Sequence, residues 1–206
     1  MIVPPHPAVE DCVFCTRRDQ PAELLHTQDF YVMPDKYPLV PGHTLVISQR
    51  PIRCHALGDD DSLLRLEELA GRVGAFLESV YGTPVMALEN GIAGQSVFHA
   101  HLHLLPMGVA ALPEAMRGWP DVTPIEGWGE VRRRLTETGS YRYLAMGGGR
   151  YVTDGHSPAL RPLREAMRRG AGIELDSRSA WIKRTTDADV DVLQRLWRER
   201  GDPIEA

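Results

Sequence analysis

The sequence predicts an α+β fold in which an antiparallel sheet carries one long helix on one face. Short β-branched and apolar runs recur through residues 27–105, and each is bounded by turn residues. A single stretch of helical periodicity, from Asp59 to Gly82, is the only long connection between these runs. The order strand, strand, helix, strand, strand therefore favours antiparallel pairing, with the helix packed on the sheet.

Four strands are expected in the first half of the chain. They lie within residues 27–33, 43–48, 85–88 and 97–105, and Pro41-Gly42 and Asn90-Gly91 are turn signals between them. In the predicted helix, apolar residues recur at spacings of three and four, which is the pattern of one buried face. These residues are Leu63, Leu66, Ala70, Val73, Leu77 and Val80.

The last of these strands carries three alternating histidines, His99, His101 and His103. Successive side chains of a strand point to opposite faces, so the three imidazoles are expected on one face and apolar residues on the other. Burial of Leu102 and Leu104 would contribute roughly 1.5–3 kcal/mol each and fix the direction in which the histidines point.

The composition changes near residue 109, because residues 1–108 carry a net charge of −6 and residues 109–206 a net charge of +1. We expect a first domain over 1–108 and an α+β C-terminal extension over 109–206 whose role the sequence does not indicate. The extension is predicted to contain a covering loop (109–126), a helix (127–138), a hairpin (141–153), a helix from Ser157 to Gly170 and a helix from about Thr186 that buries Val190, Leu193 and Trp197.

The overall composition narrows the range of partners. With 206 residues, 43% hydrophobic residues and a formal charge of −5, the chain presents no basic field for a nucleic-acid polymer or an anionic membrane. It has no apolar run of roughly 18–20 residues, and its start lacks the regions of a signal peptide, so we expect a cytoplasmic protein. Three cysteines do not form a disulfide framework and favour metal or redox roles.

The segment His99-Ala100-His101-Leu102-His103-Leu104-Leu105 resembles the signature of the histidine-triad (HIT) superfamily. Residues 93–97 are similar to the segment that precedes the triad in the fragile-histidine-triad and Hint-type branches, and residues 39–47 to the strand entry that these proteins share. The resemblance covers roughly residues 11–108. It implies that this half is a nucleotide-binding catalytic domain and that the protein forms a homodimer, for which the long helix is a plausible seam.

A neutral imidazole, with a pKa of about 6.5, is a competent nucleophile at neutral pH. The resemblance implies that His101 attacks the α-phosphorus of a nucleotide, that His103 contacts the phosphate, and that Gln95 and Ser96 lie where the leaving group departs. The expected activity is hydrolysis of a phosphoramidate, an acyl adenylate or a dinucleoside polyphosphate. The alternatives are a nucleotidyltransferase or phosphorylase, and a nucleotide-binding regulatory module without turnover.

The resemblance also implies residues that bind the nucleotide. Asp35 stands where the family binds ribose hydroxyls, although it is also suited to capping the turn beside Pro34. His43 matches a position near the base or the triad, and His99 is the first histidine of the triad. The loop before the triad is shorter than in relatives, so the α-phosphate contact falls on either Asn90 or Glu89. A carboxylate beside a phosphate is unfavourable, so we expect Asn90.

Cys12-Val13-Phe14-Cys15 is half of a possible tetrahedral zinc site. Some triad proteins complete such a site with a histidine after the second strand and the first histidine of the triad, here His55 and His99. Cys54 competes with His55 for this role, and the alternative is that the two paired cysteines are small buried apolar residues. A structural zinc is therefore the cofactor expected, and no organic cofactor is.

Overall fold

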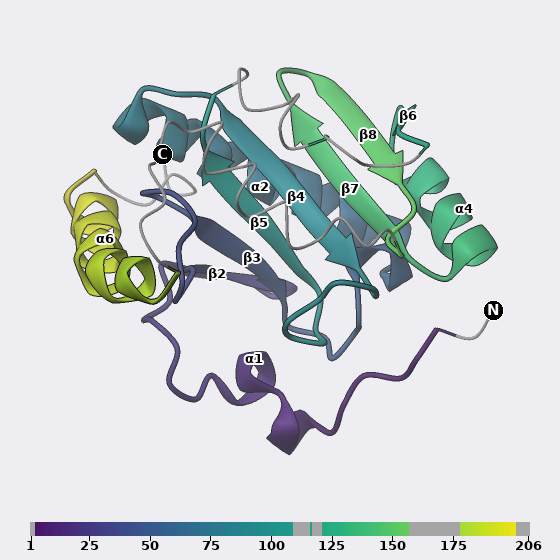
Figure 1. Ribbon diagram of the computed structural model, residues 1–206, viewed down its shortest axis with the longest axis horizontal. Helices are drawn as coiled ribbons and strands as arrows, with labels where there is room; N and C mark the ends of the chain where they lie inside the picture. Colours follow the sequence, from purple (N-terminus) through teal and green to yellow (C-terminus); the bar gives the residue numbers. More distant parts are fainter. Residues whose placement is uncertain (1–2, 109–115, 117–120, 157–177, 201–206) are drawn as a thin grey trace.

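The computed structural model describes residues 3–108, 116, 121–156 and 178–200, and only the backbone of residues 178–188 (Figure 1). Its centre is one eight-stranded sheet with the strand order β1-β2-β3-β5-β4-β7-β8-β6. All neighbouring strands pair antiparallel. The strands are β1 (Leu25–His26), β2 (Phe30–Pro34), β3 (Thr44–Ser48), β4 (Val85–Gly91), β5 (His101–Pro106), β6 (Thr123–Pro124), β7 (Tyr141–Met146) and β8 (Gly149–Thr153).

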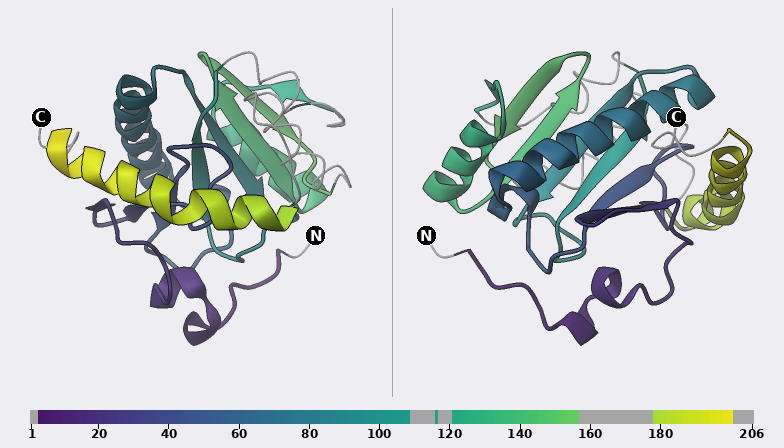
Figure 2. Two further views of the ribbon diagram at one scale, coloured as in Figure 1. Left: turned by 60° about the vertical axis from the view of Figure 1, so that its left-hand side comes forward. Right: turned by 180° about the vertical axis from the view of Figure 1, so that it is seen from behind.

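Helices α2, α4 and α6 lie on one face of this sheet and at its ends, whereas Phe14 of the short α1 packs on the opposite face. The long helix α2 crosses the sheet face, α4 lies beside the strands of the hairpin, and α6 lies at the opposite end near β2 (Figure 2). The helical elements are η1 (Val9–Asp11), α1 (Val13–Thr16), η2 (His55–Leu57), α2 (Asp60–Tyr81), α4 (Trp128–Thr138) and α6 (Arg178–Arg200). None of the described helices is long and apolar enough to cross a membrane. The predicted α+β class, with an antiparallel sheet and a long helix on one face, is confirmed.

Helix α2 begins and ends as its sequence predicts. The Asp59 carboxylate accepts a hydrogen bond from the Ser62 N–H at 2.8 Å, and Gly82 ends the helix with φ +66°, a conformation that favours glycine. The apolar face of α2 packs on the side chains of β2, β3 and β5 that point toward it, which include Val32, Val46, Leu102 and Leu104. Alternate residues of the same strands, including Tyr31, Met33, Leu45 and Ile47, cover the opposite face of the sheet.

The C-terminal half continues the sheet of the first half. Strand β7 pairs with β4 from Ala87↔Ala145 to Gly91↔Tyr141, and β8 and β6 follow outward. The Trp197 ring of α6 lies 4.6 Å from the Phe76 ring of α2. The expected boundary at residues 108/109 thus falls between two stretches of one sheet.

Four sequence-based expectations need correction. Asn90-Gly91 is not a turn but the end of β4, where both residues pair with β7. Strand β5 starts at His101, so His99 lies just before the strand. The backbone turns there and directs the His99 ring toward the Ser48 carbonyl of β3. The loop expected over 109–126 contains the short strand β6, which pairs with β8. Helix α6 starts at Arg178, earlier than the expected Thr186. The helix expected over 157–170 lies outside the described residues, whereas α4 and the β7–β8 hairpin are confirmed.

Candidate active site

His101 opens β5 on the sheet face opposite α2 and is 5% exposed. Its Nδ1 lies 2.7 Å from the backbone oxygen of His99. A carbonyl oxygen only accepts hydrogen bonds, so Nδ1 carries the proton and Nε2 keeps the lone pair. The backbone therefore fixes the tautomer of His101 whose lone pair is on Nε2.

Burial also keeps this imidazole neutral. Desolvation lowers the pKa of His101 from the ordinary value of 6.5, and the hydrogen bond to His99 together with Glu89 and Asp35 opposes this effect only in part. The ring contacts Phe14 edge-on at 5.3 Å between centroids and His103 at 4.8 Å. His101 is accordingly unprotonated and held in place at neutral pH.

His43 and His103 form a hydrogen-bonded pair next to this ring. The Leu39 N–H donates to His43 Nδ1 at 3.1 Å, so the proton of neutral His43 is on Nε2. That atom donates a hydrogen bond to His103 Nδ1 at 2.9 Å, so the N–H of neutral His103 is on its Nε2. His103 is thus presented as a hydrogen-bond donor, as a phosphate-contacting residue requires.

Asp35 lies beside this pair, with Oδ2 at 3.5 Å from His43 Nε2 and 3.9 Å from His103 Nδ1. These three donors are close enough for a cation, but a metal would need the Nε2 lone pair of His43. The Leu39 N–H on Nδ1 opposes that tautomer, so the arrangement favours proton placement over metal binding. Asp35 Oδ1 also accepts the Tyr37 N–H at 2.6 Å, so the carboxylate caps its turn whatever else it binds.

Asn90 and Glu89 point to opposite faces of β4. Leu88 pairs with His103, so Asn90, two residues further along, shares the face of the histidines and Glu89 faces α2. Of the two candidates for a phosphate contact, the structure places only Asn90 on the histidine face. Its Oδ1 accepts a hydrogen bond from Arg142 Nε of β7 at 3.1 Å.

Gln95 and Ser96 lie on the loop before β5. The Gln95 amide donates to the Arg53 backbone oxygen at 2.5 Å, and its Oε1 lies 3.4 Å from Arg53 Nε. Arg53 in turn stacks over the Phe98 ring at 4.5 Å. Ser96 is exposed, so its hydroxyl is accessible to a group that leaves toward solvent.

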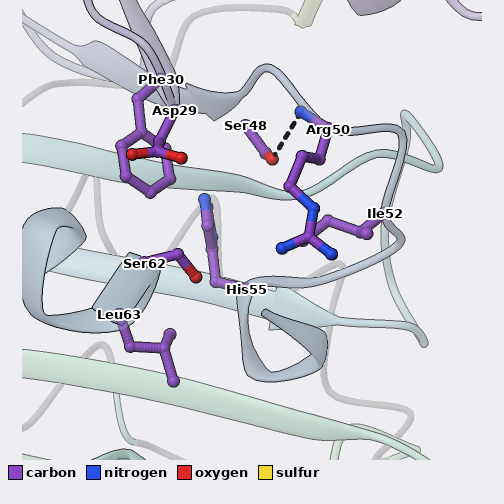
Figure 3. Close-up of a pocket in the computed structure, with 8 residues that line it drawn as sticks. All are labelled: Asp29, Phe30, Ser48, Arg50, Ile52, His55, Ser62 and Leu63. Atoms are coloured by element: carbon purple, nitrogen blue, oxygen red, sulfur yellow. Dashed lines mark hydrogen bonds between the residues drawn. The ribbon is translucent and has the colours of Figure 1, made fainter. Parts of the chain in front are cut away.

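The structure corrects the expected place of His55. Glu89, which is fully buried, accepts hydrogen bonds from the His55 backbone N–H at 2.9 Å, from His55 Nδ1 at 3.0 Å and from the Tyr141 hydroxyl at 2.6 Å. His55 thus belongs to a buried polar group under α2 and not to the cysteine pair. Its ring faces a cavity of about 10 Å³, the size of one water molecule (Figure 3). Cys54 is buried in the apolar core and is likewise not part of the cysteine cluster.

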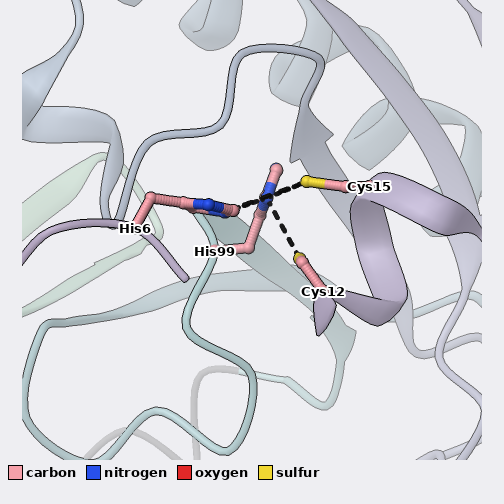
Figure 4. Close-up of side chains that lie close together, drawn as sticks. All are labelled: His6, Cys12, Cys15 and His99. Carbon is pink, nitrogen blue, oxygen red and sulfur yellow. Dashed lines mark hydrogen bonds between the residues drawn. The ribbon is translucent and has the colours of Figure 1, made fainter. Parts of the chain in front are cut away.

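The fourth residue beside the cysteines is His6, from the N-terminal arm. His6, Cys12, Cys15 and His99 point toward one another (Figure 4). His99 Nδ1 lies 3.6 Å from Cys12 Sγ, 3.4 Å from Cys15 Sγ and 2.9 Å from His6 Nε2. Tetrahedral zinc with these ligands would separate the same atoms by about 3.3–3.6 Å.

The protonation of this cluster also fits a cation. His99 Nε2 donates to the Ser48 backbone oxygen at 2.7 Å and His6 Nδ1 to the Pro7 oxygen at 2.6 Å, so the nitrogens that face the cluster carry lone pairs. Burial and the neighbouring Cys12 raise the pKa of the Cys15 thiol to about 12, so a metal must displace that proton when it binds. Two thiols and two imidazole lone pairs form a donor group suited to zinc.

Sequence reasoning missed His6, Arg142 and the Glu89–Tyr141 contact. His6 lies in a proline-rich arm whose path the sequence does not indicate, although a histidine six residues before Cys12 is a usable signal. Arg142 reaches Asn90 on the histidine face, and Tyr141 reaches Glu89 on the opposite face, only because β7 pairs with β4.

Comparison with known proteins agrees with the histidine-triad resemblance. The HIT domain family model matches residues 17–108. A HIT-like protein of Chlamydia pneumoniae is 32% identical over 97 residues, which are 43% of this chain and 86% of the relative. An uncharacterized HIT-like protein of Chlamydia trachomatis is 32% identical over 106 residues, 49% of this chain and 88% of the relative. A solved structure, a hypothetical histidine triad nucleotide-binding protein from Sulfolobus tokodaii, is 19% identical with a TM-score of 0.43 over 78% of this chain and 90% of its own. The chain belongs to the HIT-domain family.

Proposed function

We propose that this protein hydrolyses a nucleotide conjugate at its α-phosphate through a covalent nucleotidyl-histidine intermediate on His101. The observation that carries the proposal is the 2.7 Å hydrogen bond from His101 Nδ1 to the His99 carbonyl, which leaves the Nε2 lone pair as the reactive atom. The conjugates that fit are phosphoramidates, acyl adenylates and dinucleoside polyphosphates.

The chemistry takes two displacements at phosphorus. His101 Nε2 forms a bond to the α-phosphorus while the bond to the leaving group breaks, and the leaving group takes a proton through Ser96 or water. Water then attacks the phosphorus, the P–N bond to His101 breaks, and the products are a nucleoside monophosphate and the free enzyme. The donated N–H of His103 and the amide of Asn90 are suited to the phosphoryl oxygens, where developing charge is stabilised by fixed donors.

The remaining residues of the proposed site bind or position the nucleotide. Asp35 Oδ2 is the candidate acceptor for ribose hydroxyls, and Gln95 the candidate contact on the leaving-group side. His43 acts through His103, whose tautomer it fixes. His99 contributes its backbone carbonyl to His101, so its side chain is free to serve the cysteine cluster.

The test is turnover of adenosine phosphoramidate, diadenosine polyphosphate and a nucleotide sugar by the wild type and by His101→Ala, with and without orthophosphate. The proposal expects loss of at least about 1,000-fold in kcat/KM for the variant that lacks the nucleophile. His26→Ala, which removes an exposed histidine paired with Glu23, is the matched control and retains activity. Turnover that survives His101→Ala contradicts the mechanism, and turnover that requires orthophosphate favours a phosphorylase.

We also propose that His6, Cys12, Cys15 and His99 hold a structural zinc. The ion would contribute no reaction step and would fix His99, whose carbonyl orients His101. Metal analysis of the purified wild type, His6→Ala and His55→Ala tests this assignment. Zinc close to one equivalent in the wild type and His55→Ala, with a marked loss in His6→Ala, is expected. Zinc lost in His55→Ala but kept in His6→Ala would support the ligand choice expected from the sequence and contradict this one.

A further inference from the structure

A transverse row of polar side chains crosses the histidine face of the sheet. Asn90 of β4 pairs with Arg142 of β7, and the register Leu88↔His103 places Asn90 next to His101 of β5. Neighbouring strands are about 4.8 Å apart, so Asn90 stands between the nucleophile and Arg142. The row is therefore His101, Asn90 and Arg142, and Arg142 comes from the C-terminal extension.

Arg142 is fully buried, and its guanidinium remains charged at neutral pH because burial lowers the pKa only to about 10. Its Nε–H donates to Asn90 Oδ1 at 3.1 Å. An amide has one oxygen and one NH₂ group on opposite sides of its carbon, so an oxygen fixed toward β7 leaves the NH₂ group facing away from Arg142. That direction is toward His101.

We propose that Arg142 is a positioning residue, which fixes the Asn90 amide so that its NH₂ group donates to the phosphoryl group bound at His101. Without this contact the amide can rotate and present its oxygen, which repels an anion. The inference rests on the proposed function, since it names how the same site recognises phosphate. It assigns to the C-terminal extension a part in selecting a nucleotide over a nucleoside.

The test measures the affinities of AMP and adenosine for the full-length protein by calorimetry, because their ratio reports the phosphate contact without requiring turnover. Arg142→Met is expected to lower the preference for AMP by about 10–100-fold, the effect of one hydrogen bond to a charged group, and to leave adenosine binding unchanged. Arg150→Met is the matched control. It removes an arginine from the opposite face, where Arg150 pairs with Glu67 at 2.9 Å, and should keep the ratio.

A double-mutant cycle separates positioning from loss of fold. If Arg142 acts through Asn90, the double variant Arg142→Met/Asn90→Ala binds AMP no worse than Asn90→Ala alone, whereas two independent contacts would give additive losses and overturn the proposal. Asn90→Asp guards against misfolding, since its carboxylate still pairs with Arg142 but offers no donor. It should fold and lose the AMP preference, and retention of that preference would also overturn the inference.

The outcomes for the two proposals differ. A wild type that prefers AMP but turns over no conjugate refutes the hydrolase and leaves Arg142 testable by the same ratio. A wild type that hydrolyses conjugates and whose AMP preference survives Arg142→Met refutes only the role of Arg142. Equal affinity of the wild type for AMP and adenosine contradicts both.

Discussion

Removing the hydroxyl of Tyr141 should destabilise the whole molecule, because this group joins the extension to the buried centre of the first half. The hydroxyl donates to Glu89 Oε2 at 2.6 Å, and Glu89 also accepts two hydrogen bonds from His55. A hydrogen bond to a charged group contributes about 1.5–3 kcal/mol to the free energy of unfolding. For a chain of this length, that corresponds to a fall in Tm of about 3–12 °C in Tyr141→Phe.

The effect should also depend on pH in a defined direction. Burial raises the pKa of Glu89, but His55 and Tyr141 outweigh burial and hold it below the ordinary value of 4.5. A carboxylate whose pKa is depressed by folding contributes stability above its unfolded pKa, and this stability is lost as the pH falls through the folded pKa. The difference between wild type and Tyr141→Phe is therefore largest above about pH 4.5 and smaller in stronger acid.

Urea unfolding of the wild type and Tyr141→Phe, repeated about every half pH unit between pH 3 and 8, measures the loss of stability and its dependence on pH. Tyr143→Phe is the matched control, because its ring stacks on Trp128 at 4.8 Å and its hydroxyl makes no hydrogen bond to the part of the chain that the structure describes. Equal small losses in the two variants, or a loss for Tyr141→Phe that does not change with pH, would refute the assignment of an ionised Glu89 held by the extension.

Three further predictions concern activity, packing and assembly. Because burial lowers the pKa of His101, kcat/KM should stay constant down to about pH 6.5, the ordinary histidine pKa, and fall only at lower pH. A bound cation nearby would lower this pKa further. A fall in kcat/KM centred at or above pH 6.5 would contradict the effect of burial. Trp197→Ala should reduce the free energy of unfolding by about 3–5 kcal/mol in urea, since the ring packs on Phe76, and a loss under about 1 kcal/mol would show that α6 is not part of the core. Since the outer face of α2 is exposed and includes Leu64, sedimentation should show the homodimer that the resemblance implies, and a single-chain species would contradict α2 as its seam.

The sequence was sufficient for elements whose signal is local. The apolar spacing from Leu63 to Val80, with Asp59 before it and Gly82 after it, defines α2 because helix periodicity and capping involve neighbours in sequence. The alternation of residues 101–105 likewise predicts which side chains of β5 share a face. Periodicity does not show which strand pairs with which, so the pairing of β7 with β4 and the arrival of Arg142 beside Asn90 could not be predicted.

The cluster of His6, Cys12, Cys15 and His99 shows the same limit at the level of single side chains. Sequence reasoning identified the two cysteines and His99, because the cysteine spacing and the triad are local patterns. It chose His55 as the fourth ligand, yet the carboxylate of Glu89 holds that ring on the other side of the sheet. The fourth residue is His6 instead of His55. It lies in a proline-rich arm, and only the folded path of that arm brings it to His99.

The three histidines of greatest chemical interest differ in role because the backbone gives each a different hydrogen-bond partner. The Ser48 carbonyl accepts a hydrogen bond from the Nε2–H of His99, so the lone pair on Nδ1 faces the cysteines. The His99 carbonyl accepts a hydrogen bond from the Nδ1–H of His101, so the lone pair of this ring is on Nε2. The Leu39 N–H donates to His43 Nδ1, and His43 Nε2–H donates to His103 Nδ1, so His103 keeps its N–H on Nε2 as a donor. Since carbonyls only accept and N–H groups only donate, these proton positions follow from the fold and not from the imidazoles. In the proposed function, one residue type then serves as metal ligand, nucleophile and phosphate donor within five positions of the chain.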